Sequence, residues 1–230
     1  MLISPQNFPV LVNHVRSRIR RAAIAAGRDP ASVTLVAVSK SKPAESIRSV
    51  ATAGVTDFGE NYLQEALSKM NELGELPLTW HFIGGLQSNK TRAVAERFQW
   101  VHSIDRFSIA RRLSDQRPFH APPLNVFIQV SLVPEPTKGG ADPAELEQLA
   151  SKIGQLPRMK LRGLMCVPPP QPDAAAERAV FSKLRNLQEA LNARGHGLDA
   201  LSMGMSADFE SAIAEGATHV RIGTALFGSR

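Results

Sequence analysis

The residue with the clearest chemical potential is a lysine at the end of a hydrophobic segment. The stretch LVAVSKSKP begins at Leu35 and contains Lys40 and Lys42. A lysine amine that is partly withdrawn from water has a lowered pKa, and the neutral amine forms Schiff bases with carbonyl compounds. Lys40 is therefore a candidate covalent anchor. A surface lysine in a loop is the alternative, and Lys42, followed by Pro43, fits that alternative better.

Four other hydrophobic segments also end in small or polar residues. Their sequences are FGENY, HFIGGLQSNK, LSMGMS and RIGTALFG. Backbone N–H groups in glycine-rich turns that precede helices bind phosphate. The turns at 204–206 and 223–224 are therefore candidate phosphate sites. The residues of interest in the four segments are Asn61, His81, Ser202, Gly204, Ser206, Gly223 and Thr224.

The hydrophobic pattern predicts the elements that position these residues. Short β-branched segments alternate with amphipathic ones, which indicates parallel strands covered by helices. The predicted strands are 33–39, 55–60, 79–84, 100–104, 124–132, 160–167, 198–204 and 218–228. Eight such units predict an α/β protein with a (β/α)8 TIM barrel, in a single domain over 1–230. A doubly wound open sheet is the alternative, but the glycine fingerprint expected after its first strand is missing.

An extra N-terminal helix is predicted before the first strand. Apolar residues from Val10 to Ala26 recur at helical spacing, and Gly27 favours a helix end. Five arginines lie in this region before the first acidic residue, Asp29. Transit peptides and nucleic-acid-binding segments share that composition. Because no aromatic residues are interleaved for base stacking, we interpret the arginines as a solvated face and expect no nucleic-acid partner.

Composition narrows the class of protein. Of the 230 residues, 43% are hydrophobic, which suffices for a buried core, and the net charge is +6. The single cysteine, Cys166, excludes a disulfide framework and a thiolate metal cage. No apolar run reaches the roughly 18 residues of a membrane span, so we expect a cytoplasmic protein without a membrane partner. Four histidines, assigned to helices or loops without metal-ligand spacing, are His14, His120, His196 and His219.

The predicted barrel brings the candidate residues together. Active sites of TIM barrels lie at the carboxyl ends of the strands, and phosphate sites follow strands seven and eight. Lys40 would follow the first strand. A Schiff-base lysine and a phosphate site at one barrel mouth indicate pyridoxal 5′-phosphate (PLP), an aldehyde that carries a phosphate. A phosphosugar aldolase that uses Lys40 as its amine is an alternative from another class.

Longer motifs resemble one family. VAVSKSKP, DFGENYLQEA, WHFIGGLQSNK, LRGLMCVP and LSMGMSADFESAIAEGATHVRIGTALFG together resemble the pyridoxal phosphate homeostasis proteins. That family is a single-domain relative of the alanine racemase barrel, PLP fold type III, and the match spans essentially the whole chain. The resemblance implies that this protein holds PLP as a Lys40 aldimine and buffers or delivers the cofactor inside the cell.

The resemblance also implies roles for site residues. Arg221 would lie beside the cofactor, either at its ring nitrogen or at its phosphate. Asn61 and His81 match motifs that line the site, and Lys138 matches a second lysine near the entrance. Ser131 replaces the asparagine usual at the start of the entrance segment, which leaves the contacts of that segment open. The residues implied around the phosphate are Ser202, Ser206, Gly223 and Thr224.

A catalytic role is the alternative to a carrier role. Racemisation needs an acid or base on each face of the substrate carbon. In the racemases a tyrosine from a second domain supplies one of these groups across a dimer interface. This chain has one tyrosine, Tyr62, and we expect no second domain after Arg230. We therefore predict a monomeric binding protein with no catalytic residues and with apo PLP-dependent enzymes as recipients; a minimal amino-acid racemase is the alternative.

Overall fold

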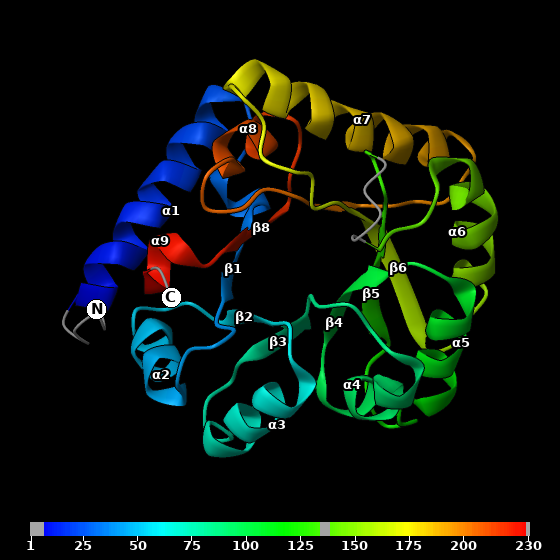
Figure 1. The fold of residues 1–230 in the computed structure, drawn as a ribbon, viewed down its shortest axis with the longest axis horizontal. Helices are drawn as coiled ribbons and strands as arrows, with labels where there is room; N and C mark the ends of the chain where they lie inside the picture. The colour runs from blue at the N-terminus through cyan, green and yellow to red at the C-terminus, as the bar shows by residue number, and fades with distance from the viewer. Residues whose placement is uncertain (1–6, 134–138, 229–230) are drawn as a thin grey trace.

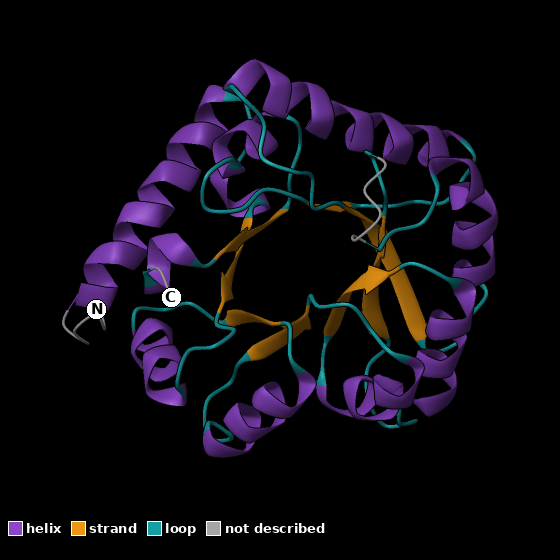
Figure 2. Ribbon diagram, viewed as in Figure 1, coloured by secondary structure: helices purple, strands orange, loops and turns teal. Residues whose placement is uncertain are grey.

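The computed structural model describes residues 7–133 and 139–228. Eight parallel strands form a closed barrel in chain order, and helices surround it (Figures 1 and 2). The (β/α)8 prediction is therefore confirmed. The strands are β1 Thr34–Val38, β2 Asp57–Glu60, β3 Thr79–Phe82, β4 Trp100–Ile104, β5 Leu124–Gln129, β6 Met159–Met165, β7 Ala200–Ser202 and β8 His219–Ile222.

The helices cover the outside of the barrel, as Figure 2 shows. None of those in the described residues has both the length and the hydropathy to cross a membrane. Their bounds are α1 Phe8–Ala25, α2 Ala44–Thr52, α3 Leu63–Glu72, α4 Thr91–Arg97, α5 Phe107–Gln116, α6 Leu146–Gly154, α7 Ala174–Ala193, α8 Phe209–Ala214 and α9 Thr224–Phe227.

The barrel has two kinds of buried environment. Most buried apolar side chains form one large cluster to which both the strands and the helices contribute. A second, small cluster contains Phe127, Met165 and Ala200, with Trp100 packed against it. Because Trp100 and Phe127 also contact ring side chains from β3 and β8, this second cluster lies in the barrel interior. The interior is thus partly aromatic and, as described below, partly polar.

Helix α1 is the predicted extra helix, and two of its arginines make hydrogen bonds and an ion pair that we did not expect. Arg18 makes a bidentate ion pair with Glu210 of α8, at 2.7 and 2.8 Å. Arg16 donates to the Ala53 and Gly54 carbonyls after α2. The expectation of a merely solvated basic face was wrong for these two residues, because they bind α1 to the barrel helices. Figure 1 shows α1 beside α8 and α9.

Two predicted strands end at least three residues earlier than the sequence pattern suggested. The strand predicted over 218–228 stops at Ile222, and Thr224–Phe227 forms helix α9. The strand predicted over 124–132 stops at Gln129. His219, assigned to a helix or loop, is instead a buried residue of β8. For both shortened strands, the apolar pattern of the sequence does not distinguish a strand from a short buried helix or an isolated bridge.

Candidate functional site

A tight turn holds Lys40 at the carboxyl end of β1. The backbone N–H of Lys42 donates to the Ser39 carbonyl at 3.0 Å, so Lys40 occupies the second position of the turn. Ser41 has φ of 60°, a left-handed conformation that is uncommon for a residue other than glycine. The Glu65 carboxylate accepts the Ser41 N–H at 2.6 Å. Several contacts therefore fix the backbone on both sides of Lys40.

A buried ionic cluster supports this turn from α3. The Lys69 ammonium donates to the Ser39 carbonyl at 2.8 Å, to Glu60 at 2.8 Å and to Glu65 at 2.5 Å. Ser39 also donates its hydroxyl to Glu60 at 2.6 Å. Burial raises the pKa of Glu60 despite these bonds, and its Oε2 is buried without a hydrogen-bond partner among the described residues. The end of β1 is thus anchored by a lysine whose removal would leave buried carboxylate charge.

Gly204 shapes the turn between β7 and α8. Its φ is 91°, which favours glycine. A Cβ at this position would lie 2.6 Å from the Ala212 Cβ and 2.9 Å from the Phe209 Cα. The turn therefore packs directly on α8, and a side chain at 204 would push the two apart.

Ser206 connects this turn to the turn after β8. Its hydroxyl accepts the Gly223 N–H at 3.2 Å and the Ala225 N–H at 3.3 Å. Gly223 in turn lies against β1, because a Cβ built on it would be 3.5 Å from the Val38 carbonyl oxygen. Thr224 is exposed. Backbone N–H groups and a hydroxyl therefore converge beside the strand that ends at Lys40.

Arg221 is a buried charge that forms no ion pair with a carboxylate among the residues that the structure describes. Its side chain is 4% exposed, and burial lowers its pKa. The guanidinium donates to the Ser202 hydroxyl at 2.7 Å and to the Cys166 carbonyl at 2.8 Å. No ion pair of the described residues includes it. A buried charge of this kind is costly unless further acceptors are supplied, so the guanidinium is suited to bind an acceptor atom of a ligand.

Beneath Arg221, a line of hydrogen bonds crosses the barrel interior. The Ser202 hydroxyl lies 2.8 Å from His102 Nδ1, and His102 Nε2 lies 2.9 Å from His81 Nδ1. His81 Nε2 lies 3.0 Å from Asp57 Oδ1. We call Arg221, Ser202, His102, His81 and Asp57 the interior chain. His81, expected at a strand end, is fully buried within β3, and the hydroxyl of Ser202, expected at the phosphate, is bonded within this chain.

Asn61 lies at the mouth, after β2. Its Oδ1 is buried and has no hydrogen-bond partner in the described part of the chain. Asn61 and Gly84 line a recess of about 330 Å³ at the ends of β2 and β3. Gly84 allows the close contact of these two loops, since a Cβ there would lie 2.3 Å from the Asn61 carbonyl oxygen. An orphaned buried acceptor of this kind is consistent with a ligand-facing position.

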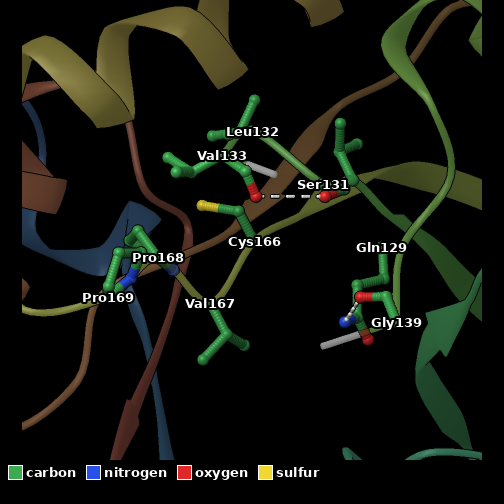
Figure 3. A pocket seen from close by; sticks show the side chains of 10 residues that line it. Gln129, Ser131, Leu132, Val133, Gly139, Cys166, Val167, Pro168 and Pro169 are labelled. Atoms are coloured by element: carbon green, nitrogen blue, oxygen red, sulfur yellow. Dashed lines mark hydrogen bonds between the residues drawn. The ribbon is translucent and has the colours of Figure 1, made fainter. Parts of the chain in front are cut away.

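The ends of β5 and β6 form another part of the mouth (Figure 3). The lining residues include Gln129, Ser131 and Val133 from the end of β5, and Cys166 and Pro168 from the end of β6. Burial raises the pKa of the Cys166 thiol to about 12. A thiol with so high a pKa is a poor nucleophile at neutral pH, so Cys166 is suited to line the wall of the mouth. Lys138, predicted near the entrance, lies outside the described residues.

The donor set at the mouth suits one kind of small molecule. Lys40 supplies an amine, Ser206 and its neighbouring N–H groups suit an anion, and Arg221 suits an acceptor atom. Over 7–133 and 139–228 no group of three acidic, histidine or cysteine side chains could hold a metal ion. These features fit PLP, whose aldehyde, phosphate and ring nitrogen need those three partners.

Comparison with known proteins identifies the family. The model of the alanine racemase N-terminal domain matches residues 11–230. The pyridoxal phosphate homeostasis protein of Pseudomonas aeruginosa is 61% identical over 216 residues, which is 94% of this chain and 93% of that protein. The chain belongs to the pyridoxal phosphate homeostasis protein family.

Solved structures agree with this membership. PipY of Synechococcus elongatus, solved with PLP bound, has a TM-score of 0.82 and 42% identity, covering 92% of this chain and 100% of PipY. The alanine racemase of Corynebacterium glutamicum has a TM-score of 0.66 at 18% identity. The match covers 94% of this chain and 60% of the racemase, and at that identity it supports the fold alone.

Proposed function

We propose that this protein binds PLP through the amine of Lys40 and acts in PLP homeostasis as a reversible carrier. The observation that carries the proposal is the position of Lys40. It follows β1, which pairs with β8, and the Gly223 turn after β8 contacts Val38. An amine and an anion-binding turn therefore adjoin at one mouth. PLP supplies an aldehyde that condenses reversibly with primary amines.

Each residue group of the mouth has a separate role in this proposal. The phosphate would be bound by the Ser206 hydroxyl and by the N–H groups of Gly223 and Ala225, which donate to Ser206 in this structure. Arg221 donates to the ring nitrogen, because its guanidinium is held within the barrel by Ser202 and Cys166 and not in the Gly223 turn. A cation there disfavours protonation of the ring nitrogen, and an unprotonated ring withdraws electrons less well. This supports a carrier over a catalyst.

The binding test compares two matched lysine variants. Lys40→Arg and Lys42→Arg each keep a positive charge and remove a primary amine. Lys42 donates to the Phe227 carbonyl at 3.0 Å, so its side chain has a structural role near α9. After PLP is added and unbound PLP is removed by gel filtration, we expect wild type and Lys42→Arg to keep the absorption band of bound PLP and Lys40→Arg to keep none. A band in Lys40→Arg equal to that of wild type would contradict the proposal.

The carrier role and the racemase alternative need a second measurement. Loaded protein is incubated with an apo PLP-dependent enzyme, and the rate of its activation is compared with the rate of spontaneous PLP release. A carrier that delivers PLP activates the enzyme faster than release permits; equal rates restrict the role to buffering. Incubation with amino acids in heavy water tests racemisation, since a racemase would incorporate deuterium at the α-carbon. We expect no incorporation above that of free PLP.

A further inference from the structure

The interior chain joins the two ends of the barrel through five side chains. Arg221 and Ser202 lie toward the carboxyl end of the strands, and Asp57 begins β2 at the amino end. Asp57 is 24% exposed and lines a recess of about 470 Å³ on the outside of that end. Its carboxylate is therefore in contact with solvent, whereas Arg221 at the other end is buried.

The chemistry of the two end groups fixes the direction of every hydrogen bond between them. An arginine only donates, so Ser202 accepts from Arg221. An ionised carboxylate only accepts, so His81 must carry its proton on Nε2 and donate it to Asp57. A neutral His81 then accepts at Nδ1 from His102 Nε2–H. His102 in turn accepts at Nδ1 from the Ser202 hydroxyl.

Both histidines are neutral in this arrangement. Burial lowers the pKa of His81 despite the neighbouring Asp57, and burial lowers that of His102 well below its ordinary value. Burial alone would raise the pKa of Asp57. Hydrogen bonds from His81 and Thr56 nevertheless keep that pKa below its ordinary value. The interior chain is thus ionised only at its two end residues, with the Arg221 cation at one end and the Asp57 anion at the other.

We propose that Asp57 is a remote positioning residue for Arg221. Its negative charge sets the tautomers of His81 and His102. With those tautomers the Ser202 hydroxyl donates to His102, and this makes its oxygen a stronger acceptor for the Arg221 guanidinium. If Asp57 loses its charge, the interior chain can reverse, so that His102 donates to Ser202. The Ser202 oxygen then accepts from both His102 and Arg221 and no longer donates its own proton to His102, which makes it a weaker acceptor for Arg221. The charge of Asp57 at the amino end of the barrel therefore affects the hydrogen bond of Arg221 at the carboxyl end.

Other charged groups surround Asp57, and they do not replace it in the chain. Arg16 and Arg20 of α1 line the same recess, and His219 of β8 interacts with Asp57 electrostatically. Burial lowers the pKa of His219 to about 3, so it is neutral, and its Nδ1 lies 2.9 Å from the Thr218 hydroxyl. His219 therefore lies beside the chain without being a member of it.

The first test uses the wild-type protein without added PLP, so it does not depend on the proposed function. Nitrogen-15 NMR of the imidazoles reports which ring nitrogen carries the proton. We expect His81 and His102 to carry it on Nε2 only at pH 7, whereas exposed His14 should average both tautomers. A proton on Nδ1 of either interior histidine, or a doubly protonated ring, would overturn the proposal.

The second test measures coupling between the two ends. Asp57→Asn and Arg221→Met are made singly and together, and the equilibrium constants for unfolding are compared. Independent sites without contact are additive within about twofold; we expect a departure of more than about threefold. Asp29→Asn is the control, because it removes a carboxylate at the same barrel end and keeps a helix-capping residue. Additivity of Asp57→Asn with Arg221→Met would refute the coupling.

Discussion

Replacing Lys69 by methionine tests how the fold holds the turn that carries Lys40. Lys69 is 5% exposed and contacts Ser39, Glu60 and Glu65. Its removal leaves the fully buried Glu60 carboxylate without a cation, and breaking a buried ion pair in this way costs about 3–5 kcal/mol. For a chain of this size each kcal/mol corresponds to about 2–4 °C in Tm. We therefore expect Tm to fall by about 6–20 °C.

Three further variants and a pH series separate this mechanism from simple loss of packing. Adding Glu60→Gln to Lys69→Met removes the unpaired charge and should restore more than half of the lost Tm. Glu60→Gln alone should cost less than Lys69→Met, because it leaves Lys69 paired with Glu65. Lys183→Met, at an exposed position of α7, should change the free energy of unfolding by no more than about 0.5 kcal/mol.

The pH dependence follows from the direction of the Glu60 shift. Burial raises the pKa of Glu60 in the folded state, and loss of Lys69 raises it further. The folded protein then binds a proton more tightly than the unfolded chain, so stability falls as pH rises from the ordinary glutamate value through the folded pKa. The deficit of Lys69→Met should be smaller at pH 5 than at pH 8. A Tm within 2 °C of wild type, or a deficit independent of pH, would refute the reasoning.

Three other predictions concern the mouth. Gly204→Ala should cost more stability than Gly195→Ala, and thermal unfolding gives the difference. Both glycines have φ near 90°, so the backbone strain of about 1–3 kcal/mol is common to both variants. Only at Gly204 would the added Cβ also clash, since a Cβ at Gly195 would meet nothing within 4 Å. Only Gly204→Ala should also weaken PLP binding. Ser206→Ala should weaken PLP binding by about 10- to 150-fold, since hydrogen bonds to charged groups contribute about 1.5–3 kcal/mol, and it should also lower Tm, because the N–H groups of Gly223 and Ala225 lose their acceptor; unchanged affinity in a PLP titration would exclude a phosphate contact. Cys166 should resist alkylation at pH 8 until the protein is unfolded, because a pKa of about 12 leaves roughly one thiol in 10⁴ ionised; rapid labelling of folded protein, followed by mass spectrometry, would contradict this.

The barrel could be predicted because its signal repeats along the chain. Eight apolar segments separated by amphipathic ones are compatible with few architectures other than a barrel. The turns that contain Gly204 and Gly223 follow the seventh and eighth segments, and barrels bind phosphate after those two strands. The position of Lys40 followed from the same periodicity. Element ends were less predictable: the apolar segment 223–227 satisfies a strand pattern, yet Thr224–Phe227 is helical in the structure.

The interior chain was not predictable from the sequence. Asp57 and His102 each lie in a strand-like segment, and nothing in their spacing indicates that both contact His81 in the barrel interior. Barrel closure brings β2, β3, β4 and β7 side chains into one interior, so the polar contacts depend on register between strands that are up to 100 residues apart in the sequence. A histidine within a buried strand is the one available signal, since a buried imidazole needs a hydrogen-bond partner.

The same limit applies to the support of Lys40. Lys69 lies in a helical segment where its charge suggests an exposed position, yet it is buried against Glu60. The local pattern could not show that the helix turns this lysine toward the end of β1.

The central claim is that Lys40 anchors PLP, and chemical mapping tests it most directly. The full-length protein is loaded with PLP, reduced with borohydride, digested and analysed by mass spectrometry. We expect one phosphopyridoxyl group, on Lys40, in wild type and in Lys42→Arg, and none in Lys40→Arg. A modification found chiefly on Lys42 or on another lysine, with Lys40 unmodified, would contradict the account.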